Sequence, residues 1–195
     1  LAAKEAKRVA AKGGEQPSLA VHLHLYYTDL LPEFVSYFAN IPYRFDLYIS
    51  CQEDADIPAI KAGLKNLKQV GKVDIRNLPN RGRDLAPLYV KFAPEILNHD
   101  YFLHVHTKKS LYSGQEKGSW RKFSLELLLG STEKINDIFD LFKNENAGLV
   151  YPDIHDEVPA IAYSWLKNSS DARKLFDEFD LGDMPSVFNY PAGSF

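Results

Sequence analysis

The chain alternates between short runs of β-branched and aromatic residues and longer segments whose apolar positions recur every three or four residues. The first pattern is typical of strands, and the second is typical of helices that bury one face. Five segments fit the strand pattern: 21–27, 45–50, 72–78, 101–106 and 147–151. Six segments fit the helix pattern: 30–41, 57–67, 85–96, 119–129, 132–144 and 171–179.

Strand and helix alternate four times within the first 110 residues. This order favours a largely parallel sheet with helices on both faces. The predicted fold class is therefore α/β, a Rossmann-like three-layer sandwich with a mostly parallel central sheet. In open sheets of this kind, ligands bind outside the carboxyl ends of the strands, so we expect the functional residues there.

Composition narrows the class of protein. A length of 195 residues fits a single domain, and the one cysteine, Cys51, excludes an intrachain disulfide and a zinc finger. We predict no transmembrane segment, and a net charge of −3 argues against nucleic-acid binding. Residues 1–18 are rich in Ala and Lys and have no apolar stripe, so we interpret them as a linker or disordered remnant of a longer protein. Residues 19–195 would form the domain, which we expect to be truncated at its C-terminus.

The sharpest motif is NRGRD, residues 80–84, which follows the third predicted strand and precedes a helix. A glycine permits close approach to a ligand, the helix start attracts anions, and guanidinium groups bind phosphate in a bidentate manner. We therefore predict that Asn80, Arg81, Gly82 and Arg83 bind a diphosphate. The alternative is a solvated turn in which Asp84 caps the helix.

A second basic motif, HTKKS, follows the fourth predicted strand. Between His104 and Lys122, five lysines and arginines stand against one acid, Glu116, although the whole chain is acidic. This asymmetry indicates an anionic ligand, to which His106, Lys108 and Lys109 would contribute. The alternative is a surface lysine pair and a core histidine.

Other strand ends carry weaker signals. Tyr26 and Tyr27 could stack on a sugar ring, and the alternating His22 and His24 share one face of a strand, where a core role is favoured over a metal. The Asp-x-Asp at residues 54–56 is interpreted as a helix cap rather than a metal site. An acidic group after the fifth predicted strand could hold a metal or supply a general base, although a solvated acidic loop is favoured: Asp153, His155, Asp156 and Glu157.

Taken in order, several segments resemble the rhamnan synthesis F family of bacterial polysaccharide assembly: VHLHLYYTDLLPEF, NRGRDLAPL, YFLHVHTKKS, GSWRKFSLELLLGS, AGLVYP and PAGSF. The resemblance implies a sugar-transferase fold of the GT-A type, a nucleotide-sugar donor such as dTDP-rhamnose, and a lipid-linked polysaccharide acceptor. It also implies a role for Gly193 and Ser194 of the PAGS motif near the sugar or acceptor. HTKKS stands where that fold usually carries Asp-x-Asp, so we expect no metal site and no required cofactor, with Mg²⁺ or Mn²⁺ left open.

Two functions remain open at this point. The first is a glycosyltransferase domain, in which Asp84, Asp153 or Glu157 deprotonates the acceptor hydroxyl and the basic residues stabilise the departing diphosphate. The second is a non-catalytic carbohydrate-binding or scaffolding module within a longer multidomain chain. In either case we expect a cytoplasmic location, with peripheral attachment to the inner face of the bacterial membrane as an option.

Overall fold

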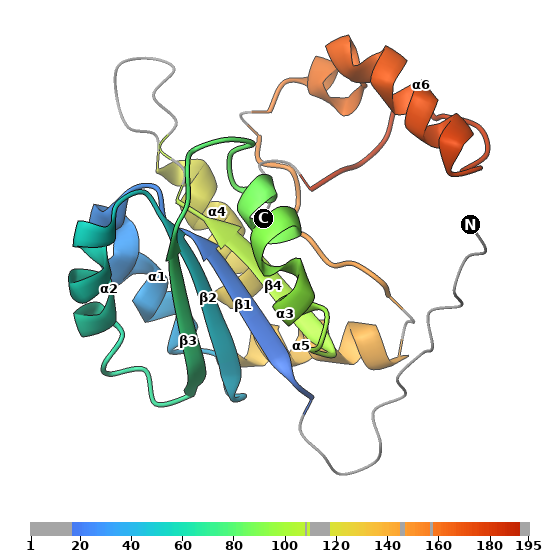
Figure 1. Ribbon diagram of the computed structural model, residues 1–195. Helices are drawn as coiled ribbons and strands as arrows, with labels where there is room; N and C mark the ends of the chain where they lie inside the picture. The colour runs from blue at the N-terminus through green and yellow to red at the C-terminus, as the bar shows by residue number, and fades with distance from the viewer. Residues whose placement is uncertain (1–16, 108, 110–117, 145–146, 157, 192–195) are drawn as a thin grey trace.

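A computed structural model describes residues 17–107, 109, 118–144, 147–156 and 158–191. Its centre is a sheet of four parallel strands in the order β3-β2-β1-β4 (Figure 1). The strands are β1 (Leu19–His24), β2 (Phe45–Cys51), β3 (Val70–Asn77) and β4 (Tyr101–His106). The predicted α/β class with a parallel sheet is confirmed, and β1 and β2 are its two inner strands.

Helices cover both faces of this sheet, as the alternation of elements predicted (Figure 1). The larger core joins one face to α1 (Leu31–Phe38), α2 (Ile57–Gly63), α4 (Ser119–Leu129) and α5 (Thr132–Asn144). The opposite face is covered by one helical segment, made of the π-helix η3 (Pro87–Phe92) and α3 (Ala93–Ile96). The result is a three-layer arrangement.

The alternation along β1 explains the two cores. Val21, Leu23 and Leu25 belong to the larger core, whereas Ala20 packs in the smaller one with Tyr48 and Phe92. Successive side chains of a strand point to opposite faces, so a central strand feeds both layers.

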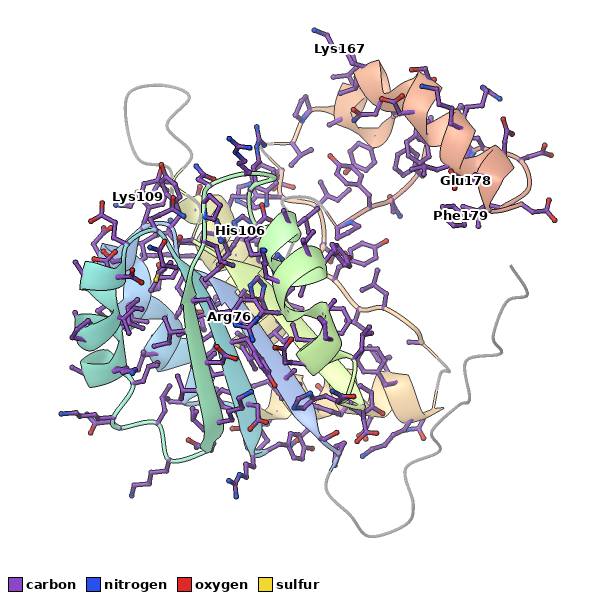
Figure 2. All side chains as sticks on the ribbon, in the orientation of Figure 1. Arg76, His106, Lys109, Lys167, Glu178 and Phe179 are labelled. Atoms are coloured by element: carbon purple, nitrogen blue, oxygen red, sulfur yellow. The ribbon has the colours of Figure 1, made fainter. Side chains whose placement is uncertain are left out.

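The outer strand β3 is tied to the helical segment by Arg76 (Figure 2). Its guanidinium group donates to the Asp74 carboxylate at 2.8 Å, to the Lys91 carbonyl at 2.6 Å and to the Glu95 carboxylate. It also lies 4.5 Å from the centre of the Phe92 ring. These contacts hold the edge strand β3 against the helical segment of η3 and α3.

The described residues also form four short 3₁₀ helices: η1 (Thr28–Leu30), η2 (Asp54–Asp56), η4 (Ala160–Tyr163) and η5 (Leu166–Asn168). The last helix, α6 (Ser169–Glu178), lies apart from the sheet in Figure 1. Trp165 packs against Phe176 and Phe188 beside this helix, and its indole N–H donates to the Pro185 carbonyl at 2.6 Å.

Two expectations need correction. The predicted fifth strand is wrong, because residues 147–151 form no strand and Leu149 is largely exposed. A short apolar run has no periodicity that separates a strand from an extended loop, and Gly148 weakens a strand. At η2, Asp56 occupies the N-cap position of α2 as predicted, but its side chain makes no capping hydrogen bond.

Most of the segment interpreted as a linker, residues 1–16, lies outside the described residues. Ser18 is attached to the fold, since its amide and hydroxyl both donate to the Asp100 carboxylate, at 2.9 and 2.8 Å. Among the helices in the described ranges, none combines the length and the apolar character needed to cross a membrane.

Candidate functional site

The turn that carries NRGRD lies at the carboxyl end of β3 and exposes Asn80, Arg81 and Arg83 to solvent. Gly82 and Arg83 both adopt the left-handed conformation, with φ of 72° and 53°. A Cβ atom on Gly82 would lie 2.4 Å from the Ala86 Cβ, so only glycine fits this position without a shift. The Ala86 amide closes the turn by donating to the Gly82 carbonyl at 3.2 Å.

Asp84, the last residue of the motif, turns inward instead of capping the helix. Its carboxylate is buried and lies 3.3 Å from Nε2 of His104, a residue of β4. Burial alone would raise the pKa of Asp84, but the hydrogen bond from His104 and the nearby His106 outweigh it and hold that pKa well below its usual range. Asp84 is therefore a carboxylate that anchors the turn to the sheet.

The chain of contacts continues into the sheet. Parallel pairing of β1 with β4 places His22 opposite His104 and His24 opposite His106. The Nδ1 atoms of His22 and His104 lie 2.9 Å apart, and their rings are within 11° of parallel with centres 5.0 Å apart. That spacing matches two rings lying edge to edge, so the contact is a hydrogen bond between imidazole nitrogens.

His22 is completely buried, and this burial, reinforced by His104, lowers its pKa to about 2. Its Nε2 atom has no hydrogen-bond partner among the described residues. Burial also lowers the pKa of His24, whose Nδ1 lies 2.7 Å from the Ser50 hydroxyl. Both histidines of β1 are therefore neutral near pH 7.

A second group of predicted residues gathers where β1 and β4 end. The Thr107 hydroxyl accepts hydrogen bonds from the amides of Tyr26 and Tyr27, at 2.8 and 3.0 Å. Lys109 forms an ion pair with Asp29 at 2.6 Å, and its ammonium lies 4.8 Å from the centre of the Tyr27 ring. Lys109 and His106 both lie near the carboxyl end of β4 in Figure 2.

The acidic segment after α5 reaches the start of α4. His155 packs against Trp120 and Phe123, with ring centres 6.4 and 5.1 Å apart, and Asp153 is exposed to solvent. Four other predicted site residues lie outside the described part of the chain: Lys108, Glu157, Gly193 and Ser194.

An apolar groove of about 610 Å³ runs beside β4. Its walls come from β4, from the helical segment that follows the turn and from residues 147–150. His104 is among the few polar residues that line it, and it also contacts Asp84 of the turn, so His104 borders both the turn and the groove.

Two more observations limit the chemistry of the described residues. Within these ranges, no group of three or more His, Cys, Asp or Glu side chains is arranged to hold a metal ion. Burial raises the pKa of Cys51, so its thiol is unsuited to act as a nucleophile near pH 7.

Sequence reasoning missed the connected chain of Asp84, His104 and His22. The signal was present as two His-x-His patterns, one on each of two predicted strands. It could be used only once the two strands were known to be neighbours.

Comparison with known proteins settles the family. A model of the family RgpF, described as rhamnan synthesis protein F, matches residues 1–189. The chain belongs to this family. The turn, the contacts between the histidines and the groove are therefore features of a rhamnan synthesis protein F, and family membership ties this protein to rhamnan synthesis. Comparisons with curated proteins and with solved structures gave no significant match.

Proposed function

We propose that this chain is a glycosyltransferase domain that transfers a sugar, rhamnose in the simplest case, from a nucleotide-diphosphate donor to a lipid-linked polysaccharide. The observation that carries the proposal is the turn at the carboxyl end of β3, which presents two exposed arginines from a left-handed backbone anchored by Asp84. Guanidinium groups presented from such a turn suit the two phosphates of a donor such as dTDP-rhamnose.

The proposed mechanism assigns charge stabilisation to the arginines. As the glycosidic bond to the diphosphate breaks, negative charge develops on the leaving oxygen, and Arg81 and Arg83 would stabilise it. Their charge can replace that of a divalent cation, so we propose that transfer does not depend on Mg²⁺ or Mn²⁺.

The acceptor hydroxyl must lose a proton to a base. Asp84 is a weak base, because its pKa is lowered and its Oδ2 lies against His104. Asp153 is solvent-exposed and lies two residues from His155, which packs on the first turns of α4. We therefore favour Asp153 as the general base and propose that Tyr26, which is partly exposed, contacts the sugar.

Calorimetric titration tests the donor site directly. The full chain is titrated with dTDP-rhamnose, with dTDP and with a rhamnose oligosaccharide, each with and without EDTA. Arg83→Ala should weaken dTDP binding at least about tenfold, the loss expected for a charge-assisted hydrogen bond. Alanine and arginine carry the same Cβ, so the left-handed backbone is equally strained in both.

Arg173→Ala is the matched control, because Arg173 is an exposed arginine on α6, away from the sheet. It should leave dTDP binding unchanged. Absence of dTDP binding, or equal binding by Arg83→Ala and the unaltered chain, would refute the donor site. Binding of the oligosaccharide alone would instead favour the carbohydrate-binding module.

A further inference from the structure

A continuous path of hydrogen bonds leads from the exposed turn into the centre of the sheet. Asp84 lies against His104 at 3.3 Å, and His104 lies against His22 at 2.9 Å. We propose that His104 is a positioning residue: it holds Asp84 in place and thereby fixes the turn whose arginines contact the donor diphosphate. The identity of the ligand rests on the proposed function, whereas the role of His104 in holding the turn does not.

The positions of the protons along Asp84, His104 and His22 follow from Asp84, which can only accept a hydrogen bond. Asp84 is ionised, so it accepts a hydrogen bond from His104 Nε2–H. With its ring proton on Nε2, His104 presents a bare Nδ1, which accepts from the Nδ1–H of His22. His22 consequently carries no proton on Nε2, the atom that has no partner among the described residues. Burial keeps His22 neutral, so the ionised Asp84 at the outer end sets which ring nitrogen carries the proton, first in His104 and then in His22.

The turn needs such an anchor. Two successive residues, Gly82 and Arg83, have positive φ, and this conformation is strained for Arg83 because it carries a Cβ atom. The side chains of the turn itself are exposed, and Asp84 is the first residue after them that is buried. Removing its partner would leave a buried carboxylate without its hydrogen bond, and the turn would be free to relax.

The first experiment measures the turn without any ligand. Hydrogen exchange of the Ala86 amide reports the turn, because this amide donates to the Gly82 carbonyl. His104→Ala should accelerate that exchange about tenfold or more, and His104→Gln, whose Nε2 can reach Asp84, should restore protection. Nitrogen-15 NMR of the imidazoles should show the Nε2–H tautomer for His104 and the Nδ1–H tautomer for His22.

The second experiment measures the consequence for dTDP. His104→Ala should weaken dTDP binding by about ten- to a hundredfold, as expected when a supporting contact is lost, and His104→Gln should recover most of it. His99→Ala is the matched control, because His99 lies against Asp46 at the same 3.3 Å but at the opposite end of the sheet: His99 precedes β4, and Asp46 stands at the start of β2. It should change neither Ala86 exchange nor dTDP binding.

If His104→Ala does not fold, Asp84→Leu addresses the same contact from the other side, because leucine has a similar size but offers no acceptor for His104 Nε2–H. It should produce the same acceleration of Ala86 exchange. Unchanged exchange in a folded variant, or an Nδ1–H tautomer for His104, overturns the positioning role. An unaltered chain that binds no dTDP refutes the proposed donor site, while the exchange and tautomer results still decide the role of His104.

Discussion

Acidification should destabilise this protein through His22, and the sign follows from linkage. In the folded chain the pKa of His22 is lowered from 6.5 to about 2, so the folded state stays unprotonated at this side chain across the mildly acid range. The unfolded chain takes up a proton as the pH falls through 6.5. Protonation therefore stabilises the unfolded state alone, and stability falls as the pH falls.

The magnitude can be worked from the same two values. Between pH 7 and pH 5, the free energy of unfolding should drop by about 2 kcal/mol on account of His22 alone, and below pH 6 by about 1.4 kcal/mol for each pH unit. His24 acts in the same direction, since burial lowers its pKa as well. Asp84, with its lowered pKa, adds to the loss only at more acid pH.

Urea unfolding followed by tryptophan fluorescence at pH values from 7.5 to 4.5 gives the required free energies. His22→Phe and His22→Gln remove the titrating group, so both should flatten the dependence on pH by the amount assigned to His22, whatever they cost at pH 7. Ile60→Val, a change at another buried position, should lower the whole curve without altering its slope. A constant difference between the unaltered chain and both His22 variants across this range would refute the reasoning.

Three further outcomes follow from packing and backbone geometry. Gly82→Ala should lower the free energy of unfolding in urea clearly more than Gly182→Ala. Both glycines have positive φ, which costs an alanine about 1 kcal/mol at either position. Only at Gly82 would the new Cβ lie 2.4 Å from another Cβ. Equal losses would show that the Ala86 contact relaxes freely. Phe34→Ala should lower the free energy of unfolding by about 3–5 kcal/mol, because Phe34 is wholly buried in the larger core; a loss below about 1 kcal/mol would contradict that packing. Cys51 should resist iodoacetamide at pH 8 in the folded chain and react rapidly in urea, since burial both covers its thiol and raises its pKa; fast labelling of the folded chain would contradict this.

Local pattern was sufficient for most of the fold. The helix expected around Ser119–Leu129 and the strand expected at residues 101–106 coincide with α4 and β4, because both have clear periodicity and well-marked ends. Residues 147–151 show the limit of this reasoning. Their apolar character is real, but whether an apolar run pairs with a strand depends on the neighbours that the fold offers, and Leu149 and Val150 instead line the groove beside β4.

The site divides in the same way. Gly82 and its flanking arginines could be found from the sequence, because a turn is specified by the residues that make it. The contact between His22 and His104 joins residues 82 positions apart and depends on β1 and β4 being neighbours in the sheet. For Asp84, the sequence suggested a helix cap or a base, and the buried partner that holds its side chain became visible only in three dimensions.

The two faces of β1 show why the acid sensitivity and the site belong together. One face is apolar along its whole length, through Val21, Leu23 and Leu25. The other begins with Ala20 in the smaller core and becomes polar toward the carboxyl end, where His22 and His24 are buried. Neutral histidines in a central strand lower stability in acid, and an apolar side chain would pack there without that cost. Because the cost falls toward the carboxyl end of the strand, where open parallel sheets generally bind their ligands, the histidines are better explained by the candidate site than by the core.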